Sequence, residues 1–216
     1  MSYIHAWIST ILVVHALWNE PHTWRDACHA YAPRYEIVLG VSVGYFIFDL
    51  LFFIRNRKVF GDNTAMVVHH LVCIVAITYC IAYRVGLFYN MCLLFTEITT
   101  ILLHQQWFLS TIGYKNGKLY QLNGLLFWIG FFFCRVVWCF LQNVHLYYYQ
   151  DQFAHAPYIF RAPIVTPSLL FLLNLYWFIL ISKRVLKHGT KSPNTADNSK
   201  SKDNKSAGDL EQKKKQ

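Results

Sequence analysis

Charged side chains are scarce in the first 182 residues of this 216-residue chain. That segment carries 17 of the 31 formal charges, under a tenth of its positions, whereas a soluble domain carries charge at roughly a quarter of its positions. The scarcity excludes a soluble globular domain. It also leaves no room for a basic patch, so the net charge of +9 does not indicate nucleic-acid binding. The basic excess lies in residues 183–216, which contain 10 Lys or Arg and 4 Asp or Glu.

Paired-cysteine motifs are also missing. None of the 6 cysteines forms a CxxC pair or stands at the spacing from histidine that a zinc site requires. Five lie inside apolar runs, where we expect them to pack as small side chains, and only Cys28 lies in a polar connection. The sequence therefore predicts no disulfide framework and no metal site. We also expect no cleavable signal peptide, because no basic residue precedes the first apolar run.

Long apolar runs make up most of the first 182 residues. A helix needs roughly 20 apolar residues to cross the hydrocarbon core of a bilayer. The candidate runs are Tyr3–Trp18, Tyr35–Ile54, Ala65–Ala82, Gly86–His104, Leu122–Gln142 and Pro163–Ser182. They predict an all-α, multi-pass transmembrane helical bundle of about six spans in residues 1–186. Residues 187–216 are too polar to bury an apolar core, so we predict a disordered, basic tail there.

The distribution of Lys and Arg over the connections predicts how the chain is oriented. With six spans, 15 of the 20 lie on the side of the two termini and 4 on the opposite side. Retained positive charge marks the cytosolic side, so both termini are predicted to be cytosolic. The chain ends Lys213-Lys214-Lys215-Gln216, which resembles the dilysine signal through which the COPI coat returns proteins to the endoplasmic reticulum. The alternative is plain solvated charge.

Chemistry in such a protein is sought among polar groups at membrane depth. An ionisable side chain there costs ~2.5–3.5 kcal/mol unless it is paired or faces a cavity. The candidates are Asp49, His69, His70, Glu97, His104 and Arg135. The adjacent imidazoles of His69 and His70 both need polar partners in mid-span, which favours a functional role for the pair. His69 shares a helix face with three small residues, which suits a cavity wall, whereas His70 heads a stripe of isoleucines. The small residues are Cys73, Ala76 and Cys80.

The other ionisable residues have structural explanations as well as functional ones. Arg135 either neutralises Glu97 or Asp49, or stacks on aromatic neighbours. We predict that it pairs with Glu97, because one unpaired charge in a low-dielectric interior costs far more than a neutralised pair. Asp49 serves equally well as a hydrogen-bond partner for its neighbours, and His104, near the end of its run, is expected to be interfacial. In the functional alternative, these four residues form a polar network that lines a lipid cavity.

Six short motifs occur in a recognisable order: Gly44-Tyr45-x-x-x-Asp49-Leu50, Lys58-Val59-Phe60-Gly61-Asp62, Val68-His69-His70, Arg84-Val85-Gly86, Thr96-Glu97-Ile98-Thr99-Thr100 and Gln105-Gln106-Trp107-Phe108. This ordered set resembles the TLC domain family, which includes translocation-associated membrane proteins and ceramide synthases. The resemblance runs from about Ile8 to Leu186. It implies a helical bundle around a lipid-accessible cavity that the paired histidines line.

The chain departs from the family pattern in two places. Ceramide synthases continue past the histidine pair to a His-Asp motif, where this chain has Leu93-Leu94, and only Glu97 stands near their later acidic position. This departure weighs against acyl transfer. Relatives also carry a membrane helix ahead of Ile8, which we expect this form to lack.

The resemblance implies three alternative functions. The first is a multi-pass protein of the endoplasmic reticulum that senses, transports or remodels membrane lipids, with sphingolipids or fatty acyl species as partners. The second is an N-acyltransferase that joins fatty acyl-CoA to a sphingoid base, with His69 or His70 as general base or acyl acceptor. The third is an accessory to protein translocation or cargo export. No cofactor is expected beyond acyl-CoA as the substrate of the enzyme, and whether the protein is an enzyme stays open.

Overall fold

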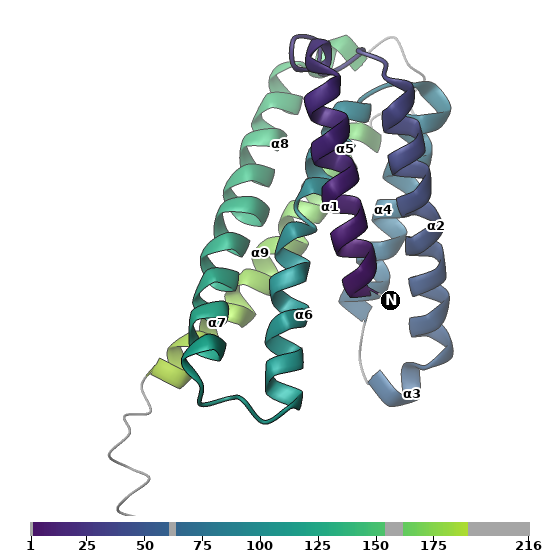
Figure 1. The fold of residues 1–216 in the computed structure, drawn as a ribbon. Helices are drawn as coiled ribbons and strands as arrows, with labels where there is room; N and C mark the ends of the chain where they lie inside the picture. The colour runs from purple at the N-terminus through teal and green to yellow at the C-terminus, as the bar shows by residue number, and fades with distance from the viewer. Residues whose placement is uncertain (1, 61–63, 154–161, 190–216) are drawn as a thin grey trace, which may run out of the picture. The chain divides into compact units, whose positions relative to one another are not determined.

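The computed structural model describes residues 2–60, 64–153 and 162–189, and these residues form helices joined by turns, with no strand among them. The predicted all-α fold is confirmed (Figure 1). The α-helices are α1 (Ser2–Asn19), α2 (Pro33–Arg55), α3 (Arg57–Phe60), α4 (Thr64–Tyr83), α5 (Leu87–Phe95), α6 (Ile98–Thr111), α7 (Lys118–Phe131), α8 (Trp138–Tyr148) and α9 (Ala162–Gly189). Two short 3₁₀ helices (Pro21–Trp24 and Gln150–Phe153) and a π-helix (Phe132–Val137) complete the described elements.

Five helical segments of the described residues are long and apolar enough to cross a membrane, in agreement with five of the predicted runs. They are Pro33–Arg55, Thr64–Tyr83, Leu87–Thr111, Lys118–Tyr148 and Val165–Lys187. The first predicted run forms α1 but is not among the five. Several polar residues interrupt its apolar sequence, and His5, Ser9 and Thr10 among them are buried against neighbouring helices. In the structure α1 therefore packs one face, which carries polar residues, against its neighbours, while Ile4, Ile8 and Ile11 on its other face are exposed.

The chain divides into two compact units, Met1–Phe178 and Ile179–Gln216. Within the first unit, α2 packs along α4, α6 packs along α7, and α1 packs against α2, α5 and α6 (Figure 1). The small side chains Cys73, Ala76 and Cys80 are buried on one face of α4, as their spacing predicts. Leu71 and Val75, on the opposite face, are about half exposed, which suits a helix that faces lipid tails. Residues 187–189 of the predicted tail belong to α9, and residues 190–216, with the dilysine-like end, lie outside the described residues.

A left-handed turn sets the start of α5. Arg84 has a φ of 55° and Gly86 a φ of 67°, a conformation that glycine adopts without steric cost. The amide nitrogen of Gly86 donates to the carbonyl oxygen of Cys28 at 2.8 Å, which ties this turn to the connection between α1 and α2. The turn thereby fixes the direction in which α5 enters the bundle.

Two of the five membrane-crossing segments contain a break in the regular α-helix. The segment Leu87–Thr111 is interrupted at Thr96 and Glu97, between α5 and α6. There the hydroxyls of Thr96 and Thr99 donate to the carbonyl oxygens three residues earlier, at 2.7 and 2.8 Å, a pattern that bends helices. The segment Lys118–Tyr148 contains the π-helix, a rare element found often at functional sites. These two breaks carry Glu97 and Arg135.

Candidate functional site

A buried ion pair joins Glu97 to Arg135. Nη2 of Arg135 lies 2.9 Å from Oε1 of Glu97, and the Arg135 side chain is only 7% exposed. The guanidinium also donates to the hydroxyls of Thr99 and Thr100, at 2.8 and 3.0 Å. Of the two carboxylates that were candidates to neutralise Arg135, the structure therefore selects Glu97, as predicted. The breaks described above make this geometry possible, because both partners lie on irregular turns.

A second buried pair joins His70 to Asp49. Nε2 of His70 lies 2.9 Å from Oδ2 of Asp49, and Nδ1 donates to the carbonyl oxygen of Met66 at 2.8 Å. A carbonyl oxygen only accepts, so Nδ1 must carry a proton. A second proton must then lie between Nε2 and the carboxylate, on one atom or the other, which leaves the pair with no net charge. Both ring nitrogens of His70 are thus engaged in structural contacts.

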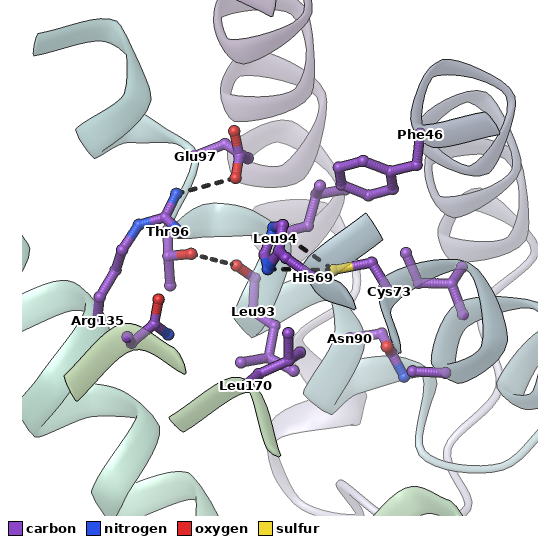
Figure 2. Close-up of a pocket in the computed structure, with 13 residues that line it drawn as sticks. Phe46, His69, Cys73, Asn90, Leu93, Leu94, Thr96, Glu97, Arg135 and Leu170 are labelled. Atoms are coloured by element: carbon purple, nitrogen blue, oxygen red, sulfur yellow. Dashed lines mark hydrogen bonds and ion pairs between the residues drawn. The ribbon is translucent and has the colours of Figure 1, made fainter. Parts of the chain in front are cut away.

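His69 faces a small polar cavity instead. Figure 2 shows His69 and Cys73, both from α4, across this cavity from Arg135 and Glu97. Sγ of Cys73 lies 3.7 Å from Nε2 of His69, and the ring of Trp177 packs edge-on at 5.3 Å. The cavity is lined by Phe46, His69, Cys73, Ala76, Ile77, Asn90, Leu93, Leu94, Thr96, Glu97, Arg135, Leu170 and Asn174. Its volume of about 40 Å³ suits a few water molecules, because a cavity of roughly 10–15 Å³ holds one, and it is too small for a lipid chain.

The six candidate residues separate into three groups. His69, Glu97 and Arg135 line the cavity, whereas Asp49 and His70 form the adjacent pair and are not part of the lining. The ring of Phe46 packs edge-on against both histidine rings, at 6.4 and 5.6 Å, and lies between the two groups. His104 lies elsewhere on α6, with its ring against Tyr3 at 6.0 Å.

Two amides in the lining, Asn90 and Asn174, were missed in the sequence. Both are buried, and Oδ1 of Asn174 has no hydrogen-bond partner among the described residues. Neither residue is ionisable, although a buried amide without a partner also carries a desolvation cost. An amide in an apolar run is thus the signal that would have found them.

Two apolar cavities lie close to the polar one. The larger, of about 710 Å³, is lined by Val14, Leu17, Trp18, Pro21, Trp24, Cys92, Phe95, Phe133, Cys134 and Trp138. The smaller, of about 260 Å³, is lined by Trp24, Ala27, Phe88, Tyr89, Cys92, Trp138, Leu141, Gln142 and His145. The two share three lining residues and so adjoin each other. The volume of the larger cavity lies in the range of about 300–1,000 Å³ that is typical of sites for small organic ligands, and that of the smaller one lies just below this range.

The polar cavity and the larger apolar cavity share a wall. Cys92 and Phe95 line the apolar cavity, while their neighbours Leu93 and Leu94 line the polar one. On the π-helix, likewise, Cys134 lines the apolar cavity and Arg135 the polar one. The same turns of helix therefore separate a polar space from one large enough for hydrocarbon.

Cys28 is buried, although the sequence places it in a polar connection. Its side chain is 3% exposed, and Sγ lies 3.5 Å from the hydroxyl oxygen of Tyr89, which in turn lies 2.7 Å from Nδ1 of His145. Burial raises the pKa of the Cys28 thiol, so the thiol stays protonated at neutral pH. All six cysteines are free thiols. Within the described ranges, no group of three or more His, Cys, Asp or Glu side chains is placed to hold a metal ion.

Comparison with known proteins gives a consistent result. The family model described as TLC domain matches residues 1–183. A TLC domain-containing protein 4 A from Dictyostelium discoideum is 31% identical over 164 residues, which cover 71% of this chain and 59% of that protein. The human TLC domain-containing protein 4 is 26% identical over 159 residues, covering 70% and 59% respectively. The chain thus spans about three fifths of the length of these relatives, and no solved structure matches it.

Proposed function

Because this chain belongs to the TLC domain family of membrane proteins, we propose that it takes part in membrane lipid homeostasis by sensing, transporting or remodelling a lipid. The lipid is a sphingolipid or a fatty acyl species. One observation carries the proposal: the wall that separates the polar cavity of His69, Glu97 and Arg135 from the apolar cavity of about 710 Å³. A lipid needs both environments, one for its polar group and one for its chain.

The size and chemistry of the two cavities determine which part of a lipid each one would hold. The polar cavity has room for only a few water molecules, so an acyl chain belongs in the apolar cavity. The wall between them is built from the last turn of α5, directly before the break at Thr96 and Glu97, and from the π-helix.

The enzyme alternative is an acyltransferase that uses acyl-CoA, and His69 is its best candidate for general base or acyl acceptor. His70 is less suited, because its two ring nitrogens contact Met66 and Asp49. However, Leu93 and Leu94, which stand where ceramide synthases carry His-Asp, line the cavity and bring no acid to His69. The alternative therefore ranks second, and a role in protein translocation or cargo export ranks third.

Photoreactive lipids test the proposal. The purified protein in lipid nanodiscs is irradiated with a photoreactive fatty acid or sphingosine, and the crosslinked peptides are mapped by mass spectrometry. We expect labels on Leu87–Phe95 and on the π-helix, and their loss in Cys134→Trp, which fills the apolar cavity. Phe140→Trp, at an exposed position on α8 outside the lining, is the matched control.

Three outcomes separate the functions. Labelling of the wild type without a covalent product supports sensing or transport. An N-acylated product that forms from acyl-CoA and a sphingoid base, and is lost in His69→Ala, establishes the enzyme. Absence of both labelling and product overturns the two lipid functions and leaves translocation or cargo export.

Residence in the endoplasmic reticulum with both termini in the cytosol is part of the proposal. It is supported by the 15 to 4 asymmetry of Lys and Arg and by the dilysine-like end, a potential contact for the COPI coat. An acceptor sequence for N-glycosylation engineered into residues 149–152 should be glycosylated, whereas the native Asn204-Lys205-Ser206 should not. Glycosylation of Asn204 would contradict this orientation.

A further inference from the structure

We infer that the two adjoining apolar cavities form a binding site for an uncharged lipid whose only polar group is a hydroxyl, of which a sterol is the membrane example. The inference goes beyond the proposed function and does not require it. It rests on the lining of the cavities, on one buried polar atom and on the direction of the site along its helix.

The lining excludes a charged ligand. Neither cavity has an Asp, Glu, Lys or Arg among its described lining residues. Trp24 and Trp138 belong to both linings and are 56% and 38% exposed, so they form a rim of flat aromatic surface. Aromatic rings of this kind bury large apolar areas against a rigid hydrocarbon body. A phosphate or ammonium headgroup would find no partner of opposite charge there.

One buried polar atom supplies a hydrogen-bond acceptor for the ligand. Gln142 lines the smaller cavity and is 6% exposed. Its Nε2 donates to the backbone oxygen of Tyr89 at 2.9 Å, but its Oε1 has no partner among the described residues. A buried acceptor without a donor is costly, so a ligand hydroxyl that donates to Oε1 is favoured.

Two of the neighbouring polar groups are already engaged, which favours a ligand that brings few polar atoms. The hydroxyl of Tyr89 pairs with Nδ1 of His145 at 2.7 Å, and Nε2 of Gln142 donates to the backbone oxygen of Tyr89. A ceramide or a diacylglycerol brings carbonyl oxygens that need further donors. A sterol brings a single hydroxyl and no carbonyl.

The site also has the direction of a lipid in a membrane. Gln142 lies six residues before Tyr148, where the segment Lys118–Tyr148 ends, about 9 Å along the helix axis. Phe133, which lines the larger cavity, lies 15 residues before the same point and is therefore deeper in the segment than Gln142. The acceptor is therefore nearer the membrane surface and the apolar end nearer the interior, as for the hydroxyl and the body of a sterol.

A photoreactive sterol tests the inference. The probe carries a diazirine on its rings and an alkyne on its tail, and it is crosslinked to the full chain in nanodiscs. We expect labelled peptides around Trp24 and around Trp138–Gln142. Free cholesterol should compete, whereas its 3-methoxy derivative, which cannot donate a hydrogen bond, should compete about 3- to 10-fold more weakly. This comparison uses the wild-type protein, so folding of a variant does not affect it.

Variants locate the contact. Gln142→Leu should lower sterol labelling by a similar factor and remove the difference between the two competitors. Ala27→Phe, which fills the smaller cavity, should abolish labelling. Val144→Phe is the control and should leave labelling unchanged, because Val144 is exposed on α8, the helix of Gln142, and lies outside both linings.

The results also separate this inference from the proposed function. Equal competition by cholesterol and its 3-methoxy derivative, or stronger competition by ceramide or diacylglycerol, would overturn it. Acyl-probe labelling without sterol labelling would overturn this inference alone. Sterol labelling without acyl-probe labelling would support it and count against the proposed function.

Discussion

Removing either partner of the Glu97–Arg135 pair should destabilise the protein strongly, and removing both should cost less than the sum. In Glu97→Gln, the Arg135 guanidinium keeps its contacts with Thr99 and Thr100 but loses its counter-ion in a buried site. In Arg135→Gln, Glu97 is left as a buried carboxylate. A broken buried pair costs about 3–5 kcal/mol, so we expect a loss of this order for each single variant.

The double variant Glu97→Gln/Arg135→Gln contains no buried charge at this site. It still loses the Thr99 and Thr100 contacts of Arg135, so its stability should not return to that of the wild type. Residues in one ion-pair network show interaction energies of about 0.5–3 kcal/mol. The double variant should therefore be less destabilised than the sum of the singles by an amount in this range.

Unfolding by sodium dodecyl sulfate in mixed micelles, followed by the fluorescence of the 7 tryptophans, measures these free energies. Arg84→Gln is the matched control. Its guanidinium lies 3.3 Å from Glu36 in an exposed pair, and such pairs contribute about 0–1 kcal/mol. Losses that add within error in the double variant would refute the coupling, and a loss in Arg84→Gln as large as that in Arg135→Gln would refute the argument from burial.

Three further predictions concern other parts of the first unit. Because the Asp49–His70 pair has no net charge, Asp49→Asn should be tolerated. Asp49→Leu leaves Nε2 of His70 unpaired and should lower the free energy of unfolding by about 1–3 kcal/mol in the same assay. Equal losses in the two variants would contradict the proton count of the pair. Gly86→Ala should lower stability by about 1 kcal/mol, because its φ of 67° strains an alanine, whereas Gly40→Ala, which meets open space, should have little effect. Since burial raises the pKa of the Cys28 thiol, maleimide should label Cys28 slowly at pH 7 and faster as the pH rises through and above the ordinary range of thiol pKa values. Asn116→Cys at an exposed position is the comparison, and equally fast labelling of both thiols at pH 7 would refute the prediction.

The sequence was sufficient to predict the helices and one important orientation. Apolar runs of sufficient length predict membrane-crossing helices because the bilayer imposes that length, and five of the six runs are such helices. The stripe of small residues on α4 also predicted that His69 would face a cavity and His70 would not. Periodicity is enough for this, since a residue's place on a helix face depends only on its neighbours along the chain.

The sequence did not predict the helix breaks. The run Gly86–His104 gives no sign of an interruption at Thr96, and the run Leu122–Gln142 gives none of a π-helix, because an apolar run looks the same in either geometry. Both breaks depend on hydrogen bonds and on packing with another helix. The partner of Asp49 and the unpaired oxygen of Gln142 were missed for the same reason: each is decided by which helix lies opposite.

The π-helix sets the rotational phase of everything that follows it in its segment. Each residue of a regular α-helix turns the chain by about 100°. A π-turn holds one residue more than an α-turn, so α8 would rotate by about that angle relative to α7 if Phe132–Val137 became a regular α-helix without losing a residue. Gln142 and His145 would then turn away from the cavity that they line. The facing of α8 therefore depends on the wider turn that carries Arg135, and relatives that lack one residue here should keep this facing with a regular α-helix.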